Sequence, residues 1–125
     1  MAYSVEYDPK EKIIIAKITG KTELAELQKV GTNLIHLAKQ ENCFCILTDL
    51  NHADLHVTTL EIFNLPQYLT EIAKAEELNV YSLRRAFVAL KDQAILDFYE
   101  TVSRNRSHHT RLFFDFEEAK NWLRG

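Results

Sequence analysis

Polar and titratable side chains gather in a segment that follows an apolar run, Cys43 to Leu50. Its chemistry-bearing members are Asp49, Asn51, His52, Asp54, His56 and Thr59. Ligands of open α/β sheets bind beyond the carboxyl ends of the strands, so we expect a partner- or ligand-binding loop here. The spacing of His52 and His56 would suit a metal ion only on a helix. Asx side chains that bond their own backbone are the simpler interpretation, and we predict no metal site.

A second cluster is basic and lies between a predicted helix and a short strand. It holds Arg104, Arg106, His108, His109 and Arg111, in a chain with 15 Lys+Arg against 18 Asp+Glu. Such side chains can bind a phosphate, a carboxylate or an acidic partner, and two histidines would add pH dependence. The alternative is a polar turn whose basic residues complement the helix dipole.

An apolar segment surrounds Pro66 and contains Phe63, Leu65, Tyr68 and Leu69. Core packing is its simplest role. The same residues would also suit a lid over a small amphiphilic ligand, or an apolar interface with a second copy of the chain in a homodimer.

No catalytic constellation is present in the sequence. Three glycines in total cannot build a phosphate-binding loop or a nucleophile elbow. Cys43 and Cys45 fall in a predicted buried strand, away from any electropositive helix start, which argues against a nucleophilic role. We therefore predict a protein that is not an enzyme and needs no cofactor.

Composition limits the class of protein. A chain of 125 residues, 46% hydrophobic and 26% charged, predicts one globular domain over residues 1–125. The net charge of −3 argues against nucleic acid as a partner. The first residues lack the basic and apolar regions of a signal peptide, and no apolar run is long enough to span a membrane. Together with two unpaired cysteines, this predicts a cytoplasmic protein.

The elements that must position these clusters follow from hydrophobic periodicity. We predict strands over 3–7 and 12–19, joined by a loop at 8–11, and then a helix over 24–38 with Thr22 as its N-cap. Further strands are expected at 43–50, 83–90 and 111–114, with a polar loop over 51–57. A short turn at 58–63 precedes a helix from about Pro66, capped near Asn64. A helix over 93–104 and a last helix capped by Asp115 complete the pattern.

The order of elements is therefore β-β-α-β-α-β-α-β-α, an α/β fold with a mostly parallel central sheet and an N-terminal hairpin. Gly31 lies on the apolar face of the first helix and predicts a close approach of that helix to the sheet. Arg84 and Arg85, at the start of a strand, predict edge charges or ion pairs facing a helix.

This order, with the closing run Arg111-Leu-Phe-Phe-Asp-Phe-Glu-Glu-Ala-Lys-Asn-Trp-Leu123, resembles the SpoIIAA-like group of the STAS superfamily, which borders on the Sec14-like lipid-binding fold. The resemblance implies a non-enzymatic regulatory domain that binds a protein partner, as anti-sigma-factor antagonists do. In that group a Ser or Thr in an Asp-Ser-Ser-Gly-type motif, which opens the second helix, is phosphorylated. The matching residue here is Thr58, although the Asp and the Gly of the motif are absent. The Sec14-like side of the resemblance implies the alternative, a small-molecule or lipid carrier.

Overall fold

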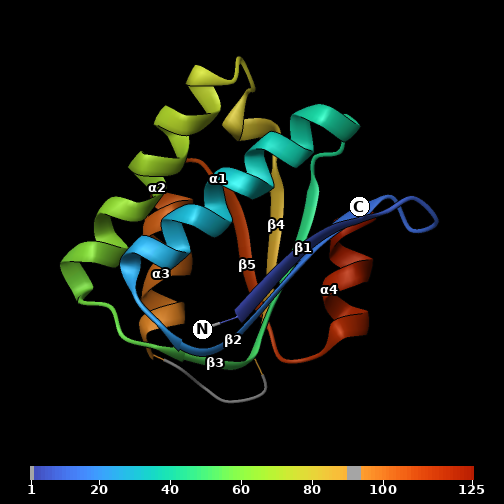
Figure 1. The fold of residues 1–125 in the computed structure, drawn as a ribbon. Helices are drawn as coiled ribbons and strands as arrows, with labels where there is room; N and C mark the ends of the chain where they lie inside the picture. The colour runs from blue at the N-terminus through green and yellow to red at the C-terminus, as the bar shows by residue number, and fades with distance from the viewer. Residues whose placement is uncertain (1, 90–93) are drawn as a thin grey trace.

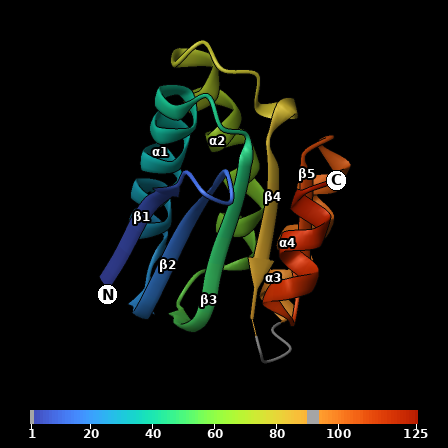
Figure 2. The ribbon, with the colours of Figure 1, turned by 90° about the vertical axis from the view of Figure 1, so that its right-hand side faces the viewer.

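The computed structural model describes residues 2–89 and 94–125 and contains one five-stranded sheet in the order β1-β2-β3-β4-β5. The strands are β1 (Ala2–Asp8), β2 (Ile13–Thr22), β3 (Cys45–Leu55), β4 (Arg84–Val88) and β5 (His109–Phe113). β1 runs antiparallel to β2, and the other neighbours are parallel (Figure 2). The predicted α/β class, the hairpin and the order of elements are confirmed.

Three helices cover one face of the sheet and one helix covers the other (Figure 1). The helices are α1 (Leu24–Glu41), α2 (Thr59–Ala75), α3 (Ala94–Asn105) and α4 (Phe116–Leu123), with a 3₁₀ turn η1 (Val80–Ser82). Each parallel strand is added on the same side of the last, and right-handed crossovers then place α1, α2 and α3 on one face. The chain turns back after β5, so α4 packs on the opposite face, against β3, β4 and β5. Leu90 and Gln93, at the ends of a predicted strand and helix, lie outside the described residues.

The alternation of side chains along the strands divides the core into two layers. The main layer, under α1 and α2, is built around Ile14, Ala16, Ile46, Leu50 and Leu83. The smaller layer, under α4, contains Ile13, Leu47, Ala86, Val88 and Phe113. β2 and β3 contribute to both layers, and this explains why their central segments are apolar almost throughout.

The predicted polar loop over 51–57 is wrong, because β3 continues to Leu55. The second half of β2 pairs with it, from Thr19 with His52 to Thr22 with Leu55. Between Asp49 and His52, β3 carries one residue more than the facing segment of β2, which makes a bulge. The bulge shifts the alternation by one, so that Ala53 and Leu55 still reach the core. The bulge interrupts the alternation of apolar and polar residues by which a strand is recognised in a sequence, and this explains the error.

The predicted break before Pro66 is also wrong, because α2 is continuous and Pro66 lies inside it. The helix spans Thr59–Ala75 with Thr58 as its N-cap, so the predicted cap near Asn64 is incorrect. Pro66 removes one backbone hydrogen bond, but its ring is fully buried in the apolar face that the helix presents to the protein. Burial of that face outweighs the loss of one bond.

The other helix starts and the glycine on α1 show smaller differences. Glu23, rather than Thr22, is the N-cap of α1 in a capping box with Glu26, while Asp115 caps α4 as predicted. Gly31 faces α2 instead of the sheet, since a Cβ added there would lie 2.6 Å from Cδ2 of Leu69. The close approach that the glycine permits is therefore between two helices.

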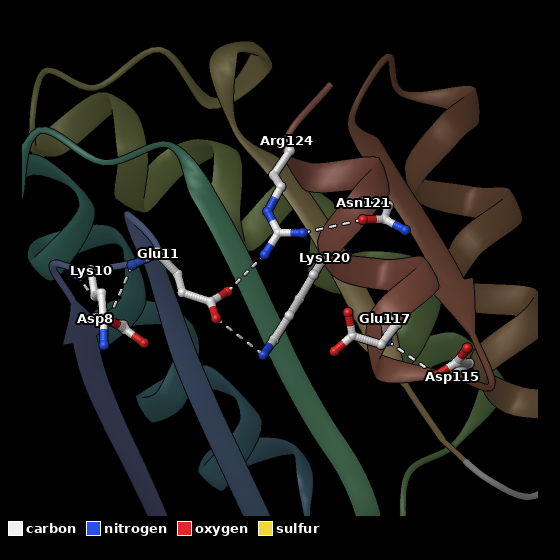
Figure 3. Close-up of polar contacts among 8 residues, drawn as sticks. All are labelled: Asp8, Lys10, Glu11, Asp115, Glu117, Lys120, Asn121 and Arg124. Atoms are coloured by element: carbon white, nitrogen blue, oxygen red, sulfur yellow. Dashed lines mark hydrogen bonds and ion pairs between the residues drawn. The ribbon is translucent and has the colours of Figure 1, made fainter.

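A polar cluster fastens α4 to the hairpin loop (Figure 3). The carboxylate of Glu11 lies 3.6 Å from Nζ of Lys120 and 3.2 Å from a guanidinium nitrogen of Arg124. Asp8 orders the same loop by accepting hydrogen bonds from the backbone N–H groups of Lys10 and Glu11. The cluster thus links the loop between β1 and β2 to the last helix of the chain.

Candidate functional site

The predicted partner-binding loop is distributed along a strand and a helix start. Asp49 accepts a hydrogen bond from the backbone N–H of Asn51 at 3.0 Å, as an Asx turn would. His56 contacts the carboxylate of Asp54 at 2.8 Å, just beyond the end of β3. His52 and His56 are separated by four residues of extended chain, about 13 Å, too far to share a metal ion. Within residues 2–89 and 94–125, no group of three His, Cys, Asp or Glu side chains is placed to bind a metal.

The two cysteines are free thiols, and neither is placed as a nucleophile. Cys45 lies at the start of β3, where its Sγ is within 3.4 Å of the backbone oxygen of Leu123. Burial, together with the neighbouring Cys43, raises the pKa of the Cys45 thiol. A thiol with a raised pKa stays protonated near neutral pH and reacts slowly.

Thr58 closes the amino end of α2 with a complete capping box. Its Oγ1 accepts a hydrogen bond from the backbone N–H of Glu61 at 3.1 Å, and the Glu61 carboxylate accepts one from the Thr58 N–H at 2.8 Å. Thr58 and Thr59 are both exposed. The Thr58 hydroxyl is thus reachable from solvent and stabilises the helix at the same time.

Replacing Thr58 tests the strength of this cap. We expect Thr58→Ala to lower the free energy of unfolding by about 1 kcal/mol, because the backbone N–H of Glu61 loses its acceptor. Thr58→Asp should stay within about 0.5 kcal/mol of the wild type, since aspartate is an equally good cap. Urea denaturation followed by circular dichroism measures both values. Equal stability of the alanine variant and the wild type would contradict this role.

The apolar segment around Pro66 divides between core and surface. Leu65 and Leu69 are buried and are not available as an interface. Tyr68 is half-buried, with its hydroxyl 3.3 Å from Oγ1 of Thr32 on α1. Phe63 is 45% exposed, and Leu60, which was not among the predicted site residues, is 68% exposed. The two exposed side chains are recognisable only once α2 is seen as one continuous helix, because its buried residues then show which face points outward.

The space beneath α2 is too small for the carrier alternative. The cavity that Leu65 and Leu69 help to line has a volume of about 60 Å³. Ligand pockets for small molecules have volumes of about 300 Å³ or more. The packed interior therefore does not favour a bound amphiphile.

A buried arginine organises the sheet face under α2 and α3. Arg85, on β4, is 6% exposed. Its guanidinium donates hydrogen bonds to the hydroxyl of Tyr99 at 2.7 Å and to Oγ1 of Thr110 at 3.1 Å, and it lies 3.3 Å from Nδ1 of His108. Among the described residues it forms no ion pair, so the predicted helix-facing ion pair is incorrect. Neutral acceptors hold this charge instead.

The arginine fixes the state of His108. Since an arginine can only donate, Nδ1 of His108 must accept, and Nε2 then carries the proton toward Oγ1 of Thr70 at 3.0 Å. Thr70 in turn donates to the carbonyl oxygen of Pro66 at 3.0 Å. Burial, with the positive charge of Arg85, lowers the pKa of His108 to about 4. His108 is thus neutral and structural near neutral pH, and it is not a surface cation.

The other members of the basic cluster point in two directions. Arg106 turns toward α2, where it donates to Oε1 of Gln67 at 3.1 Å and lies 5.4 Å from the ring of Phe63. Arg104, His109 and Arg111 line a surface hollow of about 610 Å³ at the amino end of β5. In the sequence, all these residues form one cluster. In the structure, the turn directs Arg106 toward α2 and the other three toward the hollow.

Solved structures provide the comparison for this fold. The chain is similar to the anti-sigma factor antagonist SpoIIAA in its unphosphorylated form, with a TM-score of 0.57 and 12% identity over 99% of both chains. An anti-sigma factor antagonist from Mycobacterium paratuberculosis gives a TM-score of 0.60 at 10% identity, over 99% of this chain and 96% of that one.

An uncharacterized protein of the DUF3478 family from Shewanella loihica, described as having a SpoIIAA-like fold, gives a TM-score of 0.59 at 16% identity, over 98% of this chain and 92% of that one. Neither a family model nor a curated protein matches the sequence. The chain has the SpoIIAA-like fold, in agreement with the resemblance noted in the sequence.

Proposed function

We propose that this domain is a non-enzymatic regulatory module that binds another protein through the start of α2. The observation that carries the proposal is the exposed apolar pair Leu60 and Phe63, with exposed fractions of 68% and 45%. Side chains three residues apart are neighbours on a helix, so the pair forms one patch. Contiguous apolar surface on a soluble domain is typical of a protein-binding site.

The surroundings of the pair support a protein partner. Beside it, between α1 and α2, lies a hollow of about 400 Å³, whose lining includes Leu24, Tyr68, Glu61, Asn64 and Gln67. An apolar centre with a polar rim is the usual anatomy of a protein interface. We call Leu60, Phe63 and this hollow the α2 surface.

The names of the similar structures support the same assignment. Two are titled anti-sigma factor antagonists, and SpoIIAA is also known in a phosphorylated form. Thr58 is the exposed hydroxyl beside Leu60, and it is our proposed phosphoacceptor. A phosphate on Thr58 would place negative charge next to the apolar patch and the Glu61 carboxylate, and so weaken partner binding.

Site-directed cross-linking tests the proposal. A photoreactive phenylalanine at position 63 is expected to capture one partner protein in the cells that make this chain. With that partner purified, Leu60→Asp combined with Phe63→Asp should weaken binding about 100-fold in calorimetry.

The matched control is Phe114→Asp, because Phe114 is also a half-exposed phenylalanine, at 50%, but lies outside the α2 surface. It should leave the dissociation constant within about twofold, as a change outside an interface does. Equal weakening by both variants would overturn the assignment of the α2 surface as the binding site. Cross-links to a second copy of the chain alone would overturn the proposal that the partner is another protein.

A further inference from the structure

The hollow at the amino end of β5 lies at the opposite end of the sheet from Thr58. Its lining comes from η1, from the end of α3, from the turn that follows it, from β5 itself and from α4: Tyr81, Arg104, Ser107, His108, His109, Thr110, Arg111 and Trp122. No carboxylate is among them. We call this the β5 hollow. With a volume of about 610 Å³, it has the size of a small-molecule site.

The arginines of the β5 hollow have no partner of opposite charge. Within residues 2–89 and 94–125, neither Arg104 nor Arg111 forms an ion pair. Arg84, the neighbour of His109 across the strands, lies beneath the lining, over the ring of Trp122 at 4.4 Å, and donates a hydrogen bond to the Trp122 carbonyl oxygen; among the described residues it forms no ion pair. A chain of net charge −3 thus concentrates unneutralised cations at one place. A bound anion would neutralise these arginines.

The end of α3 does not account for these side chains. Its last carbonyl groups are satisfied by the backbone, with His108 N–H donating to Ser103 at 2.9 Å and Ser107 N–H donating to Arg104 at 3.0 Å. These two bonds form a Schellman motif, completed by Ser107 in the left-handed conformation at φ 66°. Because backbone groups cap the helix, the guanidinium of Arg104 remains available.

An aromatic ring beside the cations narrows the class of ligand. Tyr81 is 50% exposed, and it contacts the ring of His108 edge-on, with centroids 5.8 Å apart. Tyr81 is thus an accessible aromatic side chain in the lining of the β5 hollow. Arginine pairs with phosphate oxygens in a bidentate manner, and an aromatic face packs against a planar organic group.

We propose that the β5 hollow binds a small phosphorylated molecule with a planar organic part. Arg104 and Arg111 hold the phosphate, and Tyr81 packs against the organic part. This site is separate from the α2 surface and does not depend on the function proposed for it.

Titration of the ¹⁵N-labelled chain with phenyl phosphate tests the proposal by nuclear magnetic resonance. We expect saturable shifts of the backbone signals over 107–111, with a dissociation constant below about 1 mM. Arg104→Gln combined with Arg111→Gln should weaken binding at least about 10-fold, because two charge-assisted contacts are lost. Tyr81→Ala should bring the affinity for phenyl phosphate down to that for inorganic phosphate.

Arg106→Gln is the matched control, since it removes one positive charge in the same turn but outside the β5 hollow. It should leave the dissociation constant within about twofold, because the Arg106 guanidinium is turned toward α2 and its charge is screened at the surface. Unchanged binding in the double variant, equal shifts with sodium sulfate at the same ionic strength, or no saturation would overturn the proposal. So would a phosphotyrosine peptide that binds about 100-fold more tightly than phenyl phosphate, because the ligand would then be a protein.

Discussion

Replacing Leu69 by alanine is expected to lower the free energy of unfolding by about 4 kcal/mol, near the upper end for such changes. Leu69 is 6% exposed and lines two internal cavities, of about 60 and about 30 Å³, that also border Gly31. Truncation joins and enlarges existing voids that the surrounding helices cannot close. Urea denaturation gives the value, with Leu60→Ala on the exposed face of the same helix as control, expected within about 0.5 kcal/mol. A loss below about 1.5 kcal/mol for Leu69→Ala would show that α2 collapses onto the sheet.

A second substitution shows that the effect arises at the contact between α1 and α2. In the wild type, the Cβ of Gly31→Ala meets Leu69 at 2.6 Å, so overpacking offsets the gain in helix propensity. In the Leu69→Ala background the overlap is gone, and Gly31→Ala should stabilise the protein by about 1 kcal/mol. Additive effects of the two substitutions would contradict the close approach at Gly31.

Acid is expected to destabilise the fold through His108. The pKa of His108 is lowered from 6.5 to about 4 in the folded protein, first by burial and then by the charge of Arg85. Between these two values the unfolded chain binds a proton that the folded protein does not. The contribution of His108 to stability is therefore complete above pH 6.5 and is lost as the pH falls toward 4. The total loss of unfolding free energy from this group is about 3 kcal/mol.

His108→Gln separates this effect from the titration of carboxylates. Glutamine keeps one donor and one acceptor but does not titrate, so the loss of stability from pH 7 to pH 4 should be smaller than in the wild type by about 3 kcal/mol. Where the variant folds too weakly to measure, the imidazole signals of the wild type report the same group directly. Protonation of His108 near pH 6.5 in the folded protein would contradict the buried network with Arg85 and Thr70.

The sequence identified the helices and strands correctly wherever a single local effect, such as hydrophobic periodicity or capping, determines the structure. The hairpin, the alternation of strands and helices, and the cap of α4 at Asp115 follow from local chemistry and were predicted correctly. The errors lie where two rules compete. At Pro66 the usual break was overruled by burial of the ring, and after Leu50 the bulge shifted the strand period that a reader of the sequence relies on.

The sequence identified several residues of the candidate sites but not how they are arranged in space. Arg104, His109 and Arg111 do line one hollow, but Tyr81 and Trp122, from distant parts of the chain, line it with them. Leu60 and Phe63 are exposed because they lie on the first turns of α2 away from its buried face, in a part of the helix for which the sequence predicted a separate turn. The spacing of residues along the chain does not show which distant residues come into contact in the fold.

The sequence by itself determined the fold class, because hydrophobic periodicity and caps act within a few residues, and right-handed crossovers then leave few topologies. Tertiary structure alone decided the environment of each polar group. The sequence predicted an edge charge or a helix-facing ion pair for Arg85 and a basic cluster that includes His108, yet strand pairing and the packing of α2 bury both, and burial favours the neutral histidine. Burial depends on which elements meet in space, and so does the chemistry of every group that it affects.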